Sequence, residues 1–152
     1  LADGRAIQEH ITDRVGVIGE KMELGFYQFV NGASSVSYIH PGNKLATIVA
    51  FNEVVDHTVA RDVAMQVAAM NPVAVRAEEV PQNARDKARQ SGKPENLLDR
   101  IAQGALQKYY KENTLLQQEF IKDSKISIEE YLRQQSKTLT ILAFSRVTLN
   151  VD

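Results

Sequence analysis

Residues 35–72 constrain the fold of this chain more than any other stretch of the sequence. Hydrophobic alternation predicts one strand over residues 35–40 and a second over residues 44–51, and the tight turn at Pro41-Gly42 fixes where the chain reverses. An Ala-rich helix follows with almost no spare residues, and Asn71-Pro72 ends it. The sequence therefore predicts a β-hairpin that leads directly into a helix.

The second of these strands is apolar on both faces. One face carries Leu45, Val49 and Phe51, and the other carries Ala46, Ile48 and Ala50. A strand that is covered on both sides belongs in the interior of a sheet and not on a wet edge. We therefore expect residues 44–51 to form an interior strand.

Helix signals recur along the chain. Asp56 or Thr58 caps the helix that follows the hairpin. The apolar stripe of that helix consists of Val59, Val63, Val67 and Met70. Ser127 and Glu130 form a capping box, which predicts the start of another short helix.

The two ends of the chain predict further strands. Residues 5–14 read as a short polar helix, residues 17–31 as a strand, and residues 138–151 as the final strand. Apolar side chains alternate along the first of these strands, with Met22, Leu24 and Phe26 on one face and Tyr27 and Phe29 on the other. Strands at both ends with helices between them predict an α+β fold: an antiparallel sheet with helices on one side, in a single domain over residues 1–152.

The sequence pattern over residues 78–111 predicts a helical hairpin, or arm. Residues 78–90 are charged, Ser91-Gly92-Lys93 breaks the helix, and Pro94 suits the first position of a second helix. The apolar stripe of the second helix is Leu98, Ile101, Ala105 and Tyr109. Two interpretations remain open: a solvated connection between core elements, or an arm that docks on another chain through this stripe.

Composition excludes several classes of function. The 18 Lys and Arg nearly balance the 19 Asp and Glu, which argues against bulk attraction to nucleic acid or to a membrane surface. The absence of cysteine excludes a disulfide framework and a thiolate metal site. No apolar run approaches the ~20 residues that span a bilayer. We expect a cytoplasmic protein, and a start at Leu1 within helical sequence predicts a piece of a longer one.

The sequence offers no catalytic, metal or cofactor site. The three histidines, His10, His40 and His57, lie in ordinary sequence with no nucleophile and orienting acid at recognisable spacing. Asp56, His57 and Asp62 read better as the N-terminal part of a helix than as metal ligands. No phosphate-binding glycine motif is present. We therefore predict that the chain is not an enzyme; a deep pocket with perturbed titratable groups would contradict this.

His40 is the most conspicuous single residue, because it lies beside the hairpin turn. One interpretation is a solvent-exposed histidine without a role. The other is a polar contact to a partner, offered from a rigid tip next to Pro41 and Gly42. Its position alone does not choose between them.

The sequence also resembles that of elongation factor Ts. The resemblance lies in RDVAMQVAAMNP (residues 61–72), in residues 91–132, in YIHPG (residues 38–42) and in Ile-Gly-Glu (residues 18–20). Together these motifs cover nearly the whole chain, but only the second half of such a protein. The resemblance implies a core domain with a coiled-coil arm.

The resemblance also implies a function. Members of this family bind elongation factor Tu in its GDP-bound or nucleotide-free state and promote GDP release, by docking and without covalent chemistry. His40, with Pro41 and Gly42, would contact the last β-barrel domain of that GTPase, and Ile18 and Gly19 would approach a helix of its GTP-binding domain. No nucleic acid or membrane takes part. Because family members also self-associate, the alternative function is a homodimerisation module without exchange activity.

This chain departs from the family pattern in two respects. The Thr-Asp-Phe-Val motif and the N-terminal three-helix module of the family are absent from it, so we expect binding without full exchange activity. The predicted arm is also uneven, with ~13 Å for residues 82–90 against ~25 Å for residues 94–110. Part of the outgoing helix, near Pro81 and Asn83, is therefore expected to be missing.

Overall fold

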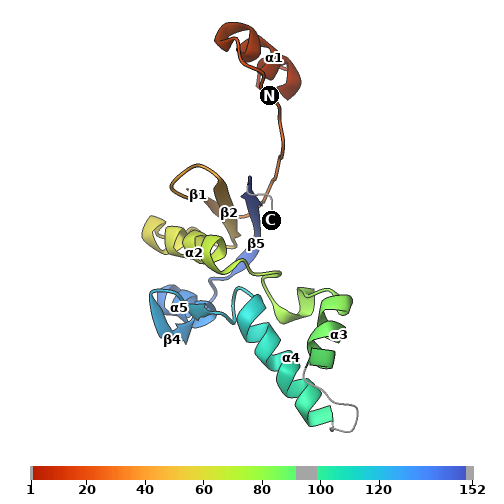
Figure 1. Cartoon of the computed structure of the whole chain (residues 1–152). Helices are drawn as coiled ribbons and strands as arrows, with labels where there is room; N and C mark the ends of the chain where they lie inside the picture. The colour runs from red at the N-terminus through yellow and green to blue at the C-terminus, as the bar shows by residue number, and fades with distance from the viewer. Residues whose placement is uncertain (1, 92–98, 150–152) are drawn as a thin grey trace.

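The computed structural model describes residues 2–91 and 99–149 of the chain (Figure 1). Its helices are α1 (Ile7–Ile18), α2 (His57–Met70), α3 (Gln82–Ser91), α4 (Asp99–Asn113) and α5 (Ile128–Gln135), with a short 3-10 helix, η1, over Ala77–Glu79. Its strands are β1 (Ser34–Ile39), β2 (Leu45–Phe51), β3 (Glu119–Phe120), β4 (Asp123–Ser127) and β5 (Ile141–Thr148). This content confirms the predicted α+β class. No helix in the described residues is long and apolar enough to cross a membrane.

The main sheet has the strand order β1-β2-β5, and both of its pairings are antiparallel. The register places Val49 of β2 opposite Val36 of β1 on one side and opposite Phe144 of β5 on the other. The strand that the sequence predicts to lie in the interior is therefore the central one.

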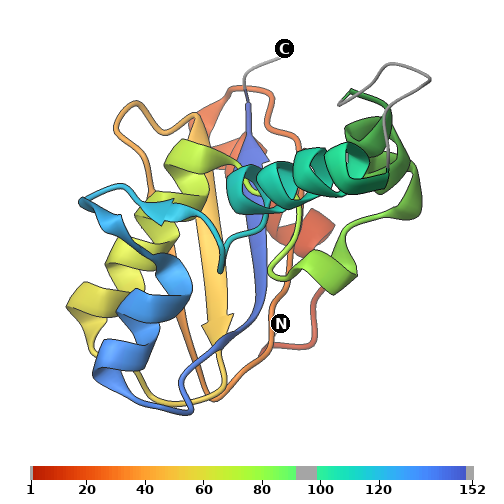
Figure 2. The same ribbon diagram turned by 90° about the horizontal axis from the view of Figure 1, so that it is seen from below.

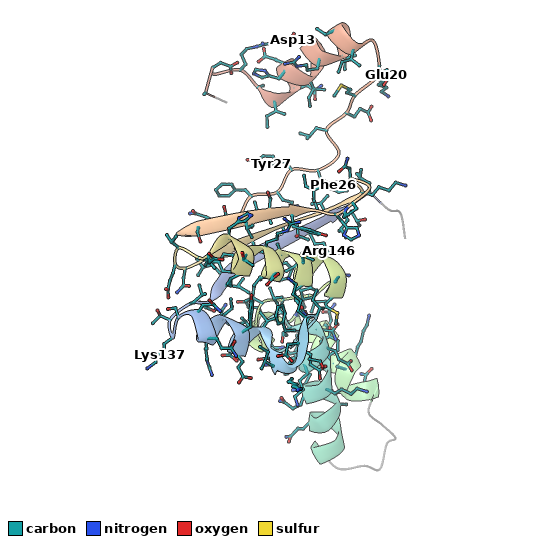
Figure 3. All side chains as sticks on the ribbon, turned by 90° about the vertical axis from the view of Figure 1, so that its left-hand side faces the viewer. Asp13, Glu20, Phe26, Tyr27, Lys137 and Arg146 are labelled. Atoms are coloured by element: carbon teal, nitrogen blue, oxygen red, sulfur yellow. The ribbon has the colours of Figure 1, made fainter. Side chains whose placement is uncertain are left out.

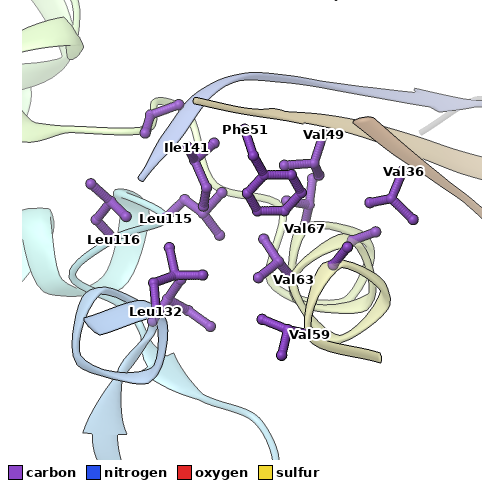
Figure 4. Close-up of a cluster of buried hydrophobic side chains, with 14 of the residues drawn as sticks. Val36, Val49, Phe51, Val59, Val63, Val67, Leu115, Leu116, Leu132 and Ile141 are labelled. Carbon is purple, nitrogen blue, oxygen red and sulfur yellow. The ribbon is translucent and has the colours of Figure 1, made fainter. Parts of the chain in front are cut away.

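Helix α2 packs on one face of this sheet, and α5 lies on the same side of it (Figures 2 and 3). Between them lies the main core (Figure 4). Its least exposed side chains, each at 0–1% of full exposure, include Val49, Phe51, Val63, Val67, Leu115, Ile128, Leu132 and Ile141. Burial of each such side chain stabilises the fold by roughly 1.5–3 kcal/mol.

Polar groups define the two ends of α2 and join its middle to the sheet. The Asp56 carboxylate accepts from the Thr58 backbone N–H at 2.9 Å, so Asp56 is the cap of this helix. Asn71 ends the helix in the left-handed conformation, with φ of 44°. In the middle of the helix, the hydroxyl of Thr47 on β2 donates to the carbonyl of Ala64 at 2.9 Å. Helix and central strand are thus joined by a bond as well as by apolar packing.

The opposite face of the sheet has no described helix packed on it (Figure 3). Ile39 is 63% exposed there, and Ile48 and Val147 are half-buried. Ala50 is nevertheless fully buried on this face. A Cβ added at Gly32 would lie 3.1 Å from the Ala50 Cβ and 2.5 Å from the Phe51 carbonyl oxygen, so the chain before β1 crosses closely over β2 at this point.

The N-terminal part differs from its prediction. Helix α1 continues through Gly16 to Ile18, beyond the predicted end at residue 14, and Gly19 ends it with φ of 77°. Residues 20–31 are extended but pair with no described strand, so the predicted strand over residues 17–31 is wrong. An extended chain becomes a strand only where a neighbour takes up its N–H and C=O groups.

Helices α3 and α4 pack against each other around a second, smaller cluster. Val80, Ala88, Leu106 and Tyr110 are buried in it together with Ala74. The pair is uneven, as the sequence predicts, with 10 residues in α3 against 15 in α4. Pro94 and Leu98 and the side chain of Ile101 lie outside the described residues. The coiled-coil character of this arm stays a prediction.

The last third of the chain contains one element that the sequence did not reveal. Strands β3 and β4 form a small antiparallel ribbon. It leads into α5, where Ser127 is confirmed as the N-cap, because its hydroxyl accepts from the Glu130 N–H at 3.2 Å. The return bond from the Glu130 side chain, which would complete the predicted capping box, stays a prediction. Strand β5 covers 141–148 of the predicted span of 138–151, and residues 150 and 151 lie outside the described residues.

Candidate partner-binding site

The hairpin between β1 and β2 brings His40, Pro41 and Gly42 together at one tip. The His40 N–H donates to the Leu45 carbonyl at 2.9 Å, and the Asn43 N–H donates to the His40 carbonyl at 3.0 Å. Gly42 and Asn43 both have positive φ, 93° and 56°, which these two residue types adopt more readily than others. The sequence thus builds a tight turn, and His40 is exposed at its edge.

The imidazole of His40 is held by its neighbour on the same strand face. The Tyr38 hydroxyl lies 3.0 Å from Nδ1 of His40. The two rings meet edge to face, with their centroids 6.0 Å apart. Tyr38 is half-buried and packs against the main core. Within the described residues, Nε2 of His40 has no bonding partner.

A hollow of about 220 Å³ lies beside this pair. Its lining comes from the hairpin, from α2 and from the turn between β3 and β4, and consists of Tyr38, His40, Leu45, Met65, Ala68, Ala69 and Ile121. Apart from the pair itself, these side chains are all apolar. The polar edge of His40 therefore adjoins a small apolar depression.

The other two predicted contact residues lie elsewhere. Ile18 is 55% exposed and Gly19 ends α1. Helix α1 stands apart from the sheet, at the end of an extended segment (Figures 1 and 3). The structure therefore brings His40, Pro41 and Gly42 together but does not bring Ile18 and Gly19 to them.

A partly buried polar cluster links α2 to the β3–β4 ribbon and to α5: Asp62 is buried, Tyr131 is half-buried and Lys122 is exposed. The Tyr131 hydroxyl donates to one carboxylate oxygen of Asp62 at 2.8 Å, and the Lys122 ammonium donates to the other. Burial, and then the bond to Asp62, raises the pKa of the Tyr131 hydroxyl well above its usual value. The Tyr131 ring also stacks on Phe120, with centroids 4.3 Å apart.

Gln66 makes a second polar connection from α2. Its amide nitrogen donates to the Glu119 carbonyl at 3.0 Å, and its oxygen accepts from the Ile121 N–H at 2.9 Å. These bonds hold the β3–β4 ribbon against the helix. Sequence reasoning did not find either connection: it placed Asp62 at a helix N-terminus and had no signal for the ribbon.

Among the described residues, no group of three or more His, Asp or Glu side chains could hold a metal ion. The perturbed Tyr131 donates to Asp62 inside a packed cluster and adjoins no nucleophile. The hollow beside the hairpin tip is lined by His40, one of the predicted contact residues, so the tip and this hollow form the candidate site.

Comparison with known proteins gives a consistent result. The model of the family described as Elongation factor TS matches residues 1–150. Elongation factor Ts of Porphyromonas gingivalis is 69% identical over 160 residues, which is 100% of this chain and 58% of that protein. The Azobacteroides pseudotrichonymphae protein of the same name is 55% identical, over 99% of this chain and 58% of its own length. That of Christiangramia forsetii is 43% identical, over 96% and 57%.

The chain spans less than three-fifths of the length of each of these relatives. The match to Porphyromonas gingivalis extends over 160 residues, whereas this chain has 152, so the relative contains residues that are absent here. The family model matches 150 residues and the identity to a relative reaches 69%, and both findings indicate the same family. The chain belongs to the elongation factor Ts family.

Proposed function

We propose that this chain binds elongation factor Tu and takes part in guanine-nucleotide exchange during translation elongation. The observation that carries the proposal is family membership over the whole chain, with the YIHPG hairpin of the family's contact histidine folded into an exposed, tightly bonded tip. The chemistry is docking: the bound chain favours a form of the GTPase that holds GDP weakly. By thermodynamic linkage, nucleotide then weakens the grip of the chain in equal measure.

The proposed contact surface has two parts. His40, with Pro41 and Gly42, offers one polar edge beside the apolar hollow. Ile18 and Gly19 offer an exposed apolar corner at the end of α1. Because α1 stands apart from the sheet (Figure 1), two separate surfaces of the partner would be engaged, in agreement with the two domains that the family resemblance implies. The place of action would be the cytoplasm, where translation elongation occurs.

A second candidate function is homodimerisation without exchange. The observation that favours it is the open face of the sheet, where Ile39 is 63% exposed and Ile48 and Val147 are half-buried. A second copy could cover this face. A mass that rises with concentration in light scattering would support the dimer, whereas binding of elongation factor Tu by a monomer would count against it.

The first test is calorimetric titration of the chain into elongation factor Tu–GDP. His40→Ala is expected to weaken binding by at least about thirtyfold if His40 is a central contact, since such contacts contribute about 2 kcal/mol or more. His57→Ala is the matched control, because His57 is an exposed histidine at the start of α2, away from the tip. We expect it to leave the dissociation constant within about twofold.

Two further measurements distinguish a lost contact from a lost fold, and binding from nucleotide exchange. The melting temperatures of the His40 and His57 variants should stay close to that of the parent, so that weaker binding reports a lost contact and not a lost fold. Release of fluorescent GDP from elongation factor Tu then separates binding from exchange. No heat with the parent chain, or equal binding by both variants, would contradict the proposed contact.

A further inference from the structure

The imidazole of His40 is not a freely rotating side chain at the hairpin tip. Tyr38 and His40 are two residues apart on β1 and its extension, so their side chains point to the same side. The 3.0 Å separation between the Tyr38 hydroxyl and Nδ1 of His40 is a good hydrogen-bond distance. Tyr38 packs on the main core, so the ring that carries this hydroxyl is held in place.

This bond assigns the proton on the ring. A phenolic hydroxyl is both donor and acceptor, and a neutral imidazole has one nitrogen of each kind. The phenolic oxygen shares its electron density with the ring and accepts weakly, whereas an unprotonated imidazole nitrogen accepts well. The favoured arrangement is therefore O–H of Tyr38 donating to Nδ1, which leaves the proton of the neutral ring on Nε2.

We propose that Tyr38 is a positioning residue for partner binding. Its hydroxyl fixes His40 in the orientation and tautomer that present Nε2–H outward, as a donor to an oxygen atom of the partner. The inference rests on the proposed function for the identity of the partner and adds the chemistry of the contact. It requires an oxygen acceptor, a carbonyl or a carboxylate, opposite His40.

Fixing the ring before contact has a direct effect on affinity. A free exposed side chain loses rotational freedom when it binds, and that loss weakens the complex. A ring already bonded through Nδ1 has lost much of this freedom beforehand. Tyr38→Phe should therefore weaken binding although it keeps the aromatic ring and removes only the hydroxyl that holds His40.

The first readout is the imidazole of the free chain. Nitrogen NMR of histidine-labelled protein, at a pH well above the usual histidine pKa of about 6.5, distinguishes the two neutral tautomers. We expect His40 of the parent to be more completely Nε2–H than His57, which is exposed and has no such neighbour. In Tyr38→Phe, His40 should shift to the ratio of His57, while His57 stays unchanged as the internal control.

The second readout is a double-mutant cycle with elongation factor Tu–GDP. Tyr38→Phe should weaken binding about three- to tenfold, and His40→Ala should weaken it at least as much. In the His40→Ala background, Tyr38→Phe should have no further effect, because the hydroxyl then has no ring to position. Phenylalanine keeps the packing on the core, and melting temperatures within a few degrees of the parent would verify this.

The outcomes separate the two proposals. If His40→Ala weakens binding but Tyr38→Phe is silent or strictly additive with it, the positioning role is wrong and the contact stands. An unchanged His40 tautomer in Tyr38→Phe also overturns the positioning role, without any need for the partner. If His40→Ala itself is silent, the proposed contact fails, and with it the role of Tyr38 in binding.

Discussion

The central strand β2 and the segment over residues 21–30 have similarly apolar sequences and opposite surroundings. Phe51 of β2 is fully buried, whereas Phe26 and Phe29 are 61% and 73% exposed. Strand β2 has a strand on each side and α2 on one face. The segment has no strand beside it in the described residues. The comparison shows that an apolar sequence makes strand formation possible, and that a neighbouring strand determines whether a strand forms.

The same comparison gives the segment a distinct physical character. Its large apolar side chains lie in the open, together with Val17 and Ile18 at the end of α1. Contiguous exposed apolar groups of this kind are uncommon on monomeric proteins and mark interaction surfaces. The core stabilises the fold, while residues 17–30 contribute little to it and remain available for contact.

The largest expected effect comes from exchanging the same residue type in the two regions. Phe51→Ala should lower the free energy of unfolding by about 3–5 kcal/mol, because it leaves a cavity between β2 and α2. Phe29→Ala, the matched variant in the exposed segment, should change it by less than about 0.5 kcal/mol. Urea denaturation followed by circular dichroism measures both. Equal losses would mean that residues 21–30 are packed in solution.

A smaller effect is expected where the two regions meet. Gly32→Ala places a Cβ 2.5 Å from the Phe51 carbonyl oxygen, which is part of the sheet backbone and cannot easily yield. We expect a loss of about 1–3 kcal/mol, as for other overpacked sites. Gly25→Ala is the control, since its Cβ would meet nothing within 4 Å. If thermal unfolding finds the two variants alike, the close crossing over β2 is wrong.

The smallest effect concerns the polar cluster under α2 and depends on pH. The Tyr131 pKa lies above its ordinary value of about 10 because burial and donation to Asp62 favour the neutral phenol. The folded protein thus keeps a proton that the unfolded chain loses above about pH 10, and its stability should fall as the pH rises past that value.

Tyr131→Phe should remove this part of the pH dependence and cost about 0.5–1.5 kcal/mol at neutral pH. Melting curves of parent and variant between pH 8 and pH 11, scanned at the same salt concentration, make the comparison. A parent whose stability declines no faster than that of the variant in this range would show that the phenol titrates normally. That result would mean that the Tyr131 side chain behaves like the exposed groups of residues 21–30 and not like the core.

Much of the core could be predicted from local sequence. The turn at Pro41-Gly42, the doubly apolar β2 and the N-cap at Ser127 each depend on residues a few positions apart. Features that depend on distant residues were missed. The β3–β4 ribbon is held by Gln66 of α2, which lies far away in the sequence.

The candidate site was also predictable only where it depends on residues that are close in sequence. Its location at His40 follows from the hairpin, and the Tyr38 neighbour was accessible from strand alternation, since residues two apart share a side. The hollow was not accessible, because Met65 and Ile121 come from two other elements. The separation of Ile18 from His40 also depends on the course of residues 20–33, which no local pattern fixes.

That extended connection has a consequence for the kinetics of the complex. Residues 20–33 span at most about 45 Å at ~3.3 Å per residue, so the two proposed contacts are joined by a tether. Once the hairpin tip has docked, α1 meets its own target at an effective concentration set by the tether and not by the solution. Loss of the α1 contact should then shorten the lifetime of the complex far more than it slows its formation.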